Sequence, residues 1–396
     1  MKKKIVVIAG TRPEAIKTVS VVRALRALPD FFDVVLCASG QHREMLPQAL
    51  ADFGLRPDIN LDVMTEAQTL SVLSSRLFLA VDELYLRENP AAVLVQGDTT
   101  TVQVAALAAF YRHIPVGHIE AGLRSHNIAV PFPEELNRRV VGLAASWHFA
   151  PTGLARRNLL AEQIPEENIL VTGNTVIDAL LWMRELVRVD APLLPAEAEE
   201  AIARNRRIIL VTGHRRESFG EGFRNICRAL LEISRRFPED RLIYPVHLNP
   251  NVRGVVNELL AGAPGIILCP PLTYKPFVRL MDSSYLILTD SGGIQEEGPS
   301  LGKPVLVMRE LTERPEGVEA GVNILVGTTV EKILETTTRL LSDREAYQSV
   351  AAIKNPYGDG RSGERIAQFL RNRLERFNIE NVETLWRRAS PPAPQA

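Results

Sequence analysis

The chain has 396 residues, of which 46% are hydrophobic, and its formal net charge at pH 7 is −1. This length allows two domains with hydrophobic cores of their own, and the near-neutral charge argues against nonspecific nucleic-acid binding. The three cysteines, Cys37, Cys227 and Cys269, do not have the spacing of metal ligands, so we expect buried, reduced thiols in a cytoplasmic protein.

Short apolar segments alternate with segments of helical periodicity along most of the chain. The first half contains four candidate strands, at residues 5–9, 34–38, 92–96 and 116–119. The second half contains five, at residues 208–212, 242–246, 266–268, 286–289 and 305–308. This alternation predicts an α/β protein with parallel sheets flanked by helices. No run of about twenty apolar residues occurs, so no membrane span is expected.

The two halves begin alike, with IVVIAGTRPE from Ile5 and IILVTGHRRE from Ile208. This weak repeat predicts two Rossmann-like lobes whose parallel sheets face a central cleft, and the alternative is a chance likeness of two turns. Prolines and charges at residues 187–207 suit a connection with one exposed helix. We expect an N-terminal lobe at 1–175, a C-terminal lobe at 176–363, a helix at 364–389 that packs back on the lobes, and a disordered tail at 390–396.

The segment LILTDSGGIQEEGPSLGKPVLVMR from Leu286 predicts a strand, a Ser-Gly-Gly turn, a short helix and a second strand. A helix N-terminus offers unpaired N–H groups and partial positive charge, so Ser291, Gly292 and Gly293 form a candidate diphosphate cradle. Glu296 and Glu297 lie about one turn later, where a carboxylate could accept ribose hydroxyls. An ordinary strand-to-helix turn is the alternative. Neither a dinucleotide fingerprint nor a Walker A motif occurs.

Five further polar clusters follow candidate strands, where doubly wound proteins keep their sites. They contain Arg12 and Lys17; Asp98; His118, Glu120 and Arg124; Glu134, Glu135 and Arg138; and His214. Each cluster also has a structural interpretation. Arg12 and Lys17 could lie on a solvated helix face. Asp98 could cap a helix that starts at Thr99, and Glu134 could pair with Arg138 on a helix surface. Together the clusters favour an active site. The cysteine partners of a zinc deaminase motif are absent, so no metal site is expected.

The clusters and their order resemble the non-hydrolysing UDP-N-acetylglucosamine 2-epimerases of bacteria and archaea. The matching motifs, between Ile5 and Gly363, are GTRPEAIKT, QHREML, GDTTT, HIEAGLRS, PFPEELNRR, VTGNTVIDAL, VTGHRRESFGEGF, PVHLNP and LTDSGGIQEEGPSLGKPVLVMRELTERPEG. The resemblance implies a glycosyltransferase-B type fold, a homodimer, and reversible conversion of UDP-GlcNAc to UDP-ManNAc without a cofactor. It also implies a role in making precursors of cell-envelope polysaccharides.

The resemblance also implies roles for individual residues. The catalytic set is Asp98, Glu120, Glu134 and His214. The substrate-binding set is Arg12, Lys17, Leu272, Phe277, Ser291, Gly292, Gly293, Glu297 and Arg314, with Phe277 near the uracil. The set for a second UDP-GlcNAc, bound as an allosteric activator, is Gln41, His42 and His247. Two positions depart from the family pattern. Leu272 replaces a polar side chain, and Ala67 replaces an arginine that some activated members carry.

The chemistry of the substrate narrows the mechanism. No neighbouring carbonyl acidifies the C2 proton of the sugar, so direct removal by a carboxylate is unfavourable, and transient oxidation would require a nicotinamide. The remaining route is loss of UDP from C1, which gives a 2-acetamidoglucal. Positioned donors such as Arg12 and His214 would stabilise the departing UDP. Proton removal and return on opposite faces of C2 requires more than one carboxylate.

Other functions stay open from the sequence alone. The nearest is the same chemistry on another UDP-2-acetamido sugar. A sugar transferase of the glycosyltransferase-B type would need an acceptor groove, and a hydrolase would release UDP and ManNAc if water trapped the glucal. A sensor that binds a UDP-sugar without turnover is a fourth possibility.

Overall fold

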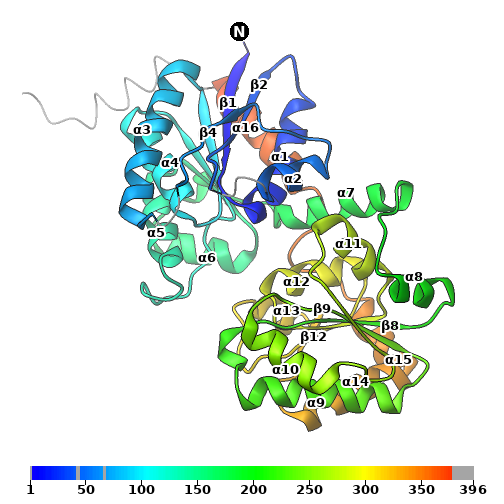
Figure 1. Cartoon of the computed structure of the whole chain (residues 1–396). Helices are drawn as coiled ribbons and strands as arrows, with labels where there is room; N and C mark the ends of the chain where they lie inside the picture. The colour runs from blue at the N-terminus through cyan, green and yellow to red at the C-terminus, as the bar shows by residue number, and fades with distance from the viewer. Residues whose placement is uncertain (1, 42–44, 66–67, 377–396) are drawn as a thin grey trace, which may run out of the picture. The chain divides into compact units, whose positions relative to one another are not determined.

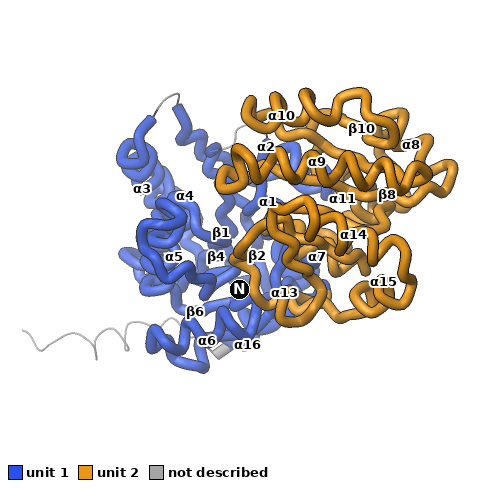
Figure 2. The backbone as a smooth tube through the Cα atoms, turned by 90° about the horizontal axis from the view of Figure 1, so that it is seen from below, with its two compact units in different colours: residues 1–178, 360–396 blue, residues 179–359 orange. Residues whose placement is uncertain are grey.

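The computed structural model of the chain describes residues 2–41, 45–65 and 68–376. These residues form two compact units (Figure 2). Of the described residues, those up to 178 and those from 360 to 376 belong to unit 1, and residues 179–359 form unit 2. The tail expected at 390–396 lies outside the described residues. None of the helices in the described ranges is long and apolar enough to cross a membrane.

Unit 1 is built on a parallel sheet of seven strands in the order β3-β2-β1-β4-β5-β6-β7. The strands are β1 (Lys3–Ala9), β2 (Phe32–Ala38), β3 (Ile59–Asn60), β4 (Ala92–Gln96), β5 (Val116–Ile119), β6 (Trp147–Ala150) and β7 (Ile169–Val171). Continuous apolar runs such as 5–8 and 92–95 are fully buried, as expected of parallel strands that helices cover on both faces.

The helices of unit 1 are shown in Figure 1. They are α1 (Arg12–Arg26), α2 (Met45–Ala51), α3 (Leu70–Glu88), α4 (Thr100–Tyr111), α5 (Glu134–Ala144), α6 (Gly153–Ala161), the 3-10 turn η1 (Glu166–Asn168), the start of α7 (Thr175–Val189), and α16 (Ser362–Arg376). The last helix returns to unit 1 and packs on α1. Gly363 makes this approach possible, because a Cβ there would lie 2.6 Å from the carbonyl oxygen of Ser20. The Gly363 amide also donates to Asp178 Oδ1 over 2.8 Å.

Unit 2 is built on a parallel sheet of six strands in the order β10-β9-β8-β11-β12-β13. The strands are β8 (Ile208–Thr212), β9 (Arg241–Pro245), β10 (Ile266–Cys269), β11 (Leu286–Thr289), β12 (Val305–Val307) and β13 (Asn323–Leu325). The helices are α8 (Ala196–Ala203), α9 (Glu221–Arg236), α10 (Pro250–Leu260), α11 (Tyr274–Ser283), α12 (Gly292–Glu297), α13 (Pro315–Glu319), α14 (Val330–Ser342) and α15 (Arg344–Ala351), with 3-10 turns η2 (Arg216–Ser218) and η3 (Gly298–Leu301).

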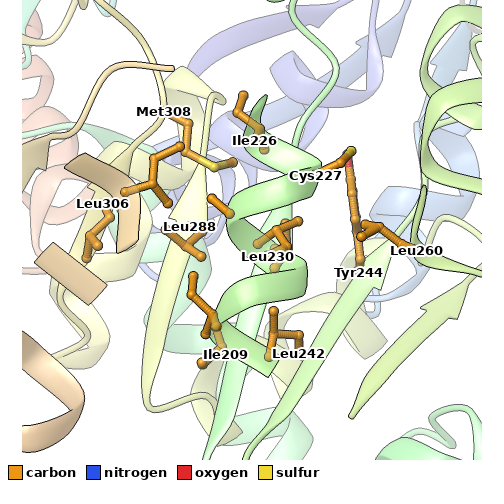
Figure 3. Close-up of a cluster of buried hydrophobic side chains, with 14 of the residues drawn as sticks. Ile209, Ile226, Cys227, Leu230, Leu242, Tyr244, Leu260, Leu288, Leu306 and Met308 are labelled. Atoms are coloured by element: carbon orange, nitrogen blue, oxygen red, sulfur yellow. The ribbon is translucent and has the colours of Figure 1, made fainter. Parts of the chain in front are cut away.

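The core of unit 2 lies between α9 and the sheet (Figure 3). Ile226 and Leu230 on the helix pack with strand residues that include Ile209, Leu242 and Leu288. The three cysteines are free and buried, as expected. Burial raises the pKa of the Cys37 and Cys227 thiols to about 12, which makes them inert.

The expected fold class is confirmed, since all nine predicted strands are present in two parallel sheets. Sequence reasoning missed β3, β6, β7 and β13, which have two to four residues each and lack a long apolar run. The expectation of an exposed helix in the connection is wrong in part. Helix α8 lies there, but it buries Ala198 and Ala201.

Candidate active site

In unit 1, two acidic residues follow neighbouring strands. Asp98 comes after β4 and Glu120 directly after β5, and these strands pair in parallel with Gln96 opposite Ile119. The backbone turns through left-handed conformations at both strand ends, with φ of 85° at Gly97 and 66° at Glu120. A positive φ is uncommon for a glutamate and is typical of functional turns.

Glu120 is held by two side chains from neighbouring elements. Its Oε2 accepts from Lys17 Nζ over 2.5 Å and from Gln96 Nε2 over 3.0 Å. The proposed solvated role of Lys17 is therefore wrong, because α1 directs this ammonium group to the carboxylate beyond β5.

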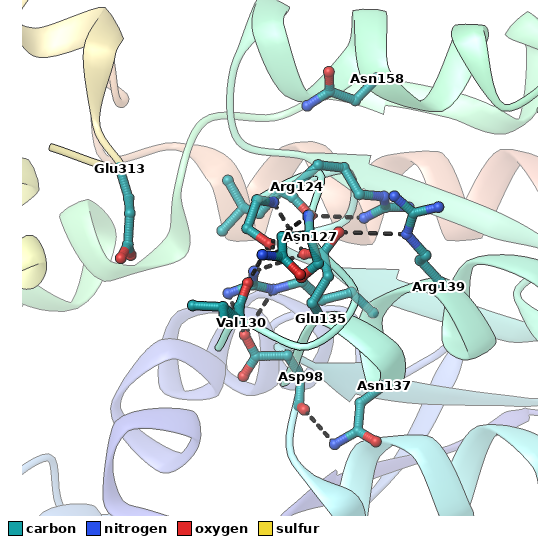
Figure 4. Close-up of polar contacts among 12 residues, drawn as sticks. Asp98, Arg124, Asn127, Val130, Glu135, Asn137, Arg139, Asn158 and Glu313 are labelled. Carbon is teal, nitrogen blue, oxygen red and sulfur yellow. Dashed lines mark hydrogen bonds and ion pairs between the residues drawn. The ribbon is translucent and has the colours of Figure 1, made fainter. Parts of the chain in front are cut away.

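Asp98 is held by Arg138 of α5. Arg138 Nη2 lies 2.7 Å and its Nε 2.9 Å from Asp98 Oδ2, and the Asn137 side chain donates to the Asp98 carbonyl over 2.8 Å (Figure 4). The capping interpretation of Asp98 is wrong. The N-cap of α4 is Thr99, whose hydroxyl accepts from the Val102 amide.

A second carboxylate, Glu135, supports Arg138 from the interior. Its Oε2 lies 3.1 Å from Arg138 Nη1 and accepts from the Ser125 amide over 3.0 Å, while Oε1 accepts from Arg139 Nε over 3.4 Å. Burial alone would raise the pKa of Glu135, but these hydrogen bonds and charges outweigh it and lower the pKa. The expected pair of Glu134 with Arg138 is wrong. Glu134 begins α5 and is half-buried, and its side chain forms no hydrogen bond or ion pair within the described ranges.

A buried glutamate that sequence reasoning missed supports the loop after β1. Glu14 Oε2 accepts from the amides of Gly10 and Thr11 over 2.6 and 3.3 Å. Burial raises the pKa of Glu14 to about 7, against the lowering effect of these hydrogen bonds. The signal in the sequence was the capping box Thr-x-x-Glu at the start of α1.

His118 supports the turn that precedes Asp98. Its Nε2 lies 2.8 Å from the carbonyl oxygen of Gly97. Burial lowers the pKa of His118 to about 3, so the ring is neutral and Nε2–H donates to this carbonyl. Across the ranges that the structure describes, no group of three or more His, Cys, Asp or Glu residues could hold a metal ion.

In unit 2, His214 follows β8 and Asp290 follows the adjacent strand β11. The completely buried Asp290 accepts the amides of His214 and Arg215 on Oδ2, over 2.6 and 2.7 Å. The His214 ring stacks on His247, with centroids 5.0 Å apart. Burial lowers the pKa of His214, with smaller contributions from His247 and Arg215, while Asp290 opposes them.

The Ser-Gly-Gly turn begins α12, with Ser291 at the N-cap. The Ser291 amide is not free, because it donates to Thr289 Oγ1 over 3.0 Å, so the amides of Gly292 and Gly293 remain as candidate phosphate donors. A Cβ at Gly292 would lie 3.8 Å from Arg215 Nη2 and 4.0 Å from Arg314 Cζ. Two guanidinium groups therefore lie beside this glycine, an arrangement suited to a diphosphate.

Residues 23–371 of this chain match the sequence family described as UDP-N-acetylglucosamine 2-epimerase. The UDP-N-acetylglucosamine 2-epimerase of Yersinia pestis is 52% identical over 372 residues, which cover 93% of this chain and 98% of the relative. The chain belongs to the UDP-N-acetylglucosamine 2-epimerase family.

Solved structures agree with this assignment. The UDP-GlcNAc 2-epimerase from Neisseria meningitidis, in a crystal structure with bound UDP-GlcNAc, is 45% identical with a TM-score of 0.83, over 93% of this chain and 99% of that chain. A glycosyltransferase from Rickettsia africae is 15% identical with a TM-score of 0.62, over 95% of this chain and 100% of that chain, and so shares the fold alone. This epimerase therefore has the glycosyltransferase-B type fold.

The remaining residues expected at the site of this epimerase lie in several elements. The half-buried Leu272 precedes α11, and the half-buried Phe277 lies on that helix. Glu297 accepts from Tyr274 Oη over 2.7 Å, so Tyr274 is a neighbour that sequence reasoning missed. Arg314 forms an ion pair with Glu296. Arg12 is the exposed first residue of α1.

The three residues expected to bind an activator are only partly described. Gln41 accepts from Thr101 Oγ1 over 3.0 Å in unit 1. His247 is exposed in unit 2 and stacks on His214, as described above. His42, and the departure at Ala67, lie outside the described residues. The functional roles of all these residues stay predictions.

Proposed function

We propose that this epimerase interconverts UDP-GlcNAc and UDP-ManNAc without hydrolysis or added cofactor. The Neisseria relative binds UDP-GlcNAc, which supports the substrate. The observation that carries the proposal is a pair of oriented carboxylates at neighbouring strand ends. Asp98 forms an ion pair with Arg138, and Glu120 forms one with Lys17. Oriented acids and bases of this kind are what inversion at C2 requires.

Unit 2 supplies the groups for the departing nucleotide in this proposal. The C1–O bond breaks, and its electron pair leaves with the diphosphate of UDP. The Gly292 and Gly293 amides, Arg314 and His214 stabilise the charge that develops on the diphosphate. Ser291, Leu272 and Phe277 lie along the rest of the nucleotide, and Glu297 accepts from the ribose.

Unit 1 supplies the groups for the sugar in this proposal. One carboxylate takes the C2 proton as UDP leaves, which forms the C1–C2 double bond of 2-acetamidoglucal. Another group returns a proton to the opposite face of C2 while UDP adds again to C1. We assign these transfers to the set Asp98, Glu120 and Glu134, with Arg12 and Lys17 beside the substrate.

The test is proton NMR of the purified protein with UDP-GlcNAc in D₂O and no nicotinamide. Formation of UDP-ManNAc with deuterium at C2 is the expected result, because the returning proton comes from an exchangeable group. Free ManNAc would instead establish hydrolysis. UDP-ManNAc that keeps the original C2 hydrogen would refute proton exchange during the reaction.

We further propose that the protein is a homodimer through the outer face of α3, α4 and α5. These neighbouring helices expose large apolar side chains: Leu79, Leu86, Phe110, Tyr111, Leu136 and Leu143. Leu79 and Leu86 lie two turns apart on one side of α3, and Leu136 and Leu143 repeat that spacing on α5. Large apolar side chains that neighbouring helices expose together are typical of protein interfaces.

We also propose that UDP-GlcNAc acts as an activator through Gln41, His42 and His247. The stacking of His247 on His214 supports this proposal, because it connects a residue assigned to the activator with one assigned to catalysis. We place the protein in the cytoplasm, where it would supply precursors for cell-envelope polysaccharides.

A further inference from the structure

Asp290 uses only one of its two oxygens to hold the backbone. The side chain follows β11 and is completely buried. Oδ2 accepts both the His214 and the Arg215 amide, over 2.6 and 2.7 Å. Oδ1 has no hydrogen-bond partner among the described residues and lies 3.5 Å from His214 Nδ1.

A carboxylate oxygen buried without a donor is costly. Within the described part of the chain, the ion-pair partner of Oδ1 is the His214 imidazole. A neutral imidazole carries its proton on one nitrogen, and the hydrogen bond that this nitrogen makes determines which one it is. An oxygen that only accepts and faces Nδ1 favours the Nδ1–H tautomer and leaves Nε2 unprotonated.

We propose that Asp290 is a positioning residue that holds His214 in the Nδ1–H tautomer, so that Nε2 exchanges a proton with the departing and returning UDP. This role of His214 rests on the proposed function. Nε2 accepts a proton when the ring is neutral. Once the ring is protonated, Nε2–H donates to a diphosphate oxygen, and the Asp290 carboxylate compensates the charge of the imidazolium.

A purely structural role would not require Oδ1. Two other hydrogen bonds already hold the turn after β8. Tyr244 Oη donates to the Gly213 carbonyl over 2.8 Å, and the Asp290 amide donates to the Thr212 carbonyl over 3.2 Å. The other groups that face the imidazole are the stacked His247 ring and Arg215. Arg215 has only donors, and the His247 ring is stacked on the imidazole at an interplanar angle of 17°, so it does not lie in the plane of the Nδ1–H bond.

The test is ¹H–¹⁵N NMR of histidine side chains in the ¹⁵N-labelled full-length protein at about pH 8, where the His214 ring is neutral. The His214 signals are assigned by their loss in a His214→Gln variant. We expect a protonated Nδ1 and a bare Nε2 in the native protein. In Asp290→Asn the side-chain carbonyl would accept from the His214 and Arg215 amides, and the NH₂ group would face Nδ1. The proton of the neutral His214 ring should therefore move to Nε2.

Tyr244→Phe is the matched control, because it loosens the same turn without touching the imidazole, and it should keep the Nδ1–H tautomer. We expect Asp290→Asn to lower kcat by about 10²–10⁴-fold; the same change in a Ser-His-Asp triad costs about 10⁴-fold. UDP affinity should change by less than about threefold.

A native His214 with its proton on Nε2, or an Asp290→Asn protein that keeps the Nδ1–H tautomer, would overturn the proposal. The tautomer is read without turnover. A tautomer shift in a protein that does not epimerise UDP-GlcNAc would therefore contradict the proposed function while it supports the role of Asp290.

Discussion

Replacing Arg138 with glutamine should separate stability from catalysis at the unit 1 site. The native guanidinium binds Asp98 at 2.7 and 2.9 Å and the buried Glu135 at 3.1 Å. In Arg138→Gln, Glu135 would keep only the Ser125 amide and Arg139 at 3.4 Å. Asp98 would lose the cation that orients it.

The magnitude follows from the burial of the three side chains. Breaking a buried ion pair costs about 3–5 kcal/mol, because the remaining charge stays buried without its partner. Glu135 is fully buried, but the Arg138 and Asp98 side chains are 15% and 25% exposed, so solvent reduces the penalty to roughly 2–3 kcal/mol. For a unit of this size that loss lowers the melting temperature by about 5–10 °C.

In Arg138→Gln, kcat should fall by more than the loss of folded protein alone would explain. A positioned acid or base contributes about 10²–10⁴-fold, so a disoriented Asp98 should lower kcat by about 10²-fold. Initial rates of UDP-ManNAc formation measure this loss, at a temperature where melting curves show the variant to be folded. UDP affinity, which we assign to unit 2, should change by less than about threefold.

Arg139→Gln is the matched control. Arg139 lies at the middle of the same helix and contacts the same Glu135, but it is 42% exposed and forms no ion pair with Asp98 in the described part of the chain. We expect a loss below about 1 kcal/mol and nearly unchanged kcat. Equal kcat losses in the two variants, or an Arg138→Gln protein with native kcat, would refute the role assigned to Arg138.

Three further predictions concern other parts of the molecule. The pKa of Glu14 is raised from 4.5 to about 7, so its stabilising contribution is complete below about pH 4.5 and is lost as the pH rises through 7. In Glu14→Gln, the decrease in the free energy of unfolding between pH 4.5 and 7 should therefore be smaller by about 3 kcal/mol. Denaturant unfolding at several pH values measures this difference. Gly363→Ala should speed proteolysis at α16, because a Cβ there would lie 2.6 Å from a carbonyl oxygen of α1. The control is Gly254→Ala, where a Cβ would have no atom within 4 Å, and it should leave the rate of proteolysis unchanged. Leu143→Asp, at a side chain that is 82% exposed, should yield a folded monomer in light scattering, and a dimer of unchanged mass would exclude α5 from the interface.

The sequence predicted the sheets better than the contacts at their ends. Parallel strands that are buried on both faces appear as continuous apolar runs, so Ala92–Gln96 and Leu286–Thr289 were predicted to the residue. Short strands such as Asn323–Leu325 are set by their neighbours in the sheet, and their own residues carry too little signal.

Two errors at the site, those on Glu134 and Asp98, came from helix starts. Residues that are adjacent in a helix point about 100° apart, so which of two consecutive glutamates meets Arg138 depends on where α5 begins. Glu135 faces the interior, and Glu134 does not reach Arg138. The same one-residue ambiguity made Asp98 a candidate cap, whereas Thr99 caps α4 and leaves the Asp98 carboxylate to Arg138.

Strand order explains why the repeated openings IVVIAGTRPE and IILVTGHRRE matter. In unit 1 the chain runs outward from β1 to β3 and then returns to β4 on the other side of β1. In unit 2 it runs from β8 to β10 and returns to β11 on the other side of β8. Each repeated segment therefore contains the strand next to the point where the strand order of its sheet reverses. Ligands of doubly wound folds bind at this point.

The residues after these strands fit that position. The first turn of α1, directly after the loop that follows β1, carries Arg12 and the buried Glu14, and Asp98 follows β4. The loop after β8 carries His214 and Arg215, and Asp290 and Ser291 follow β11. A chance likeness of two βα turns would not place both copies at equivalent strands of two sheets with the same order of their first six strands. The repeat therefore reflects two Rossmann-like units that each present polar groups at the reversal point, and it indicates which loops to mutate first in each unit.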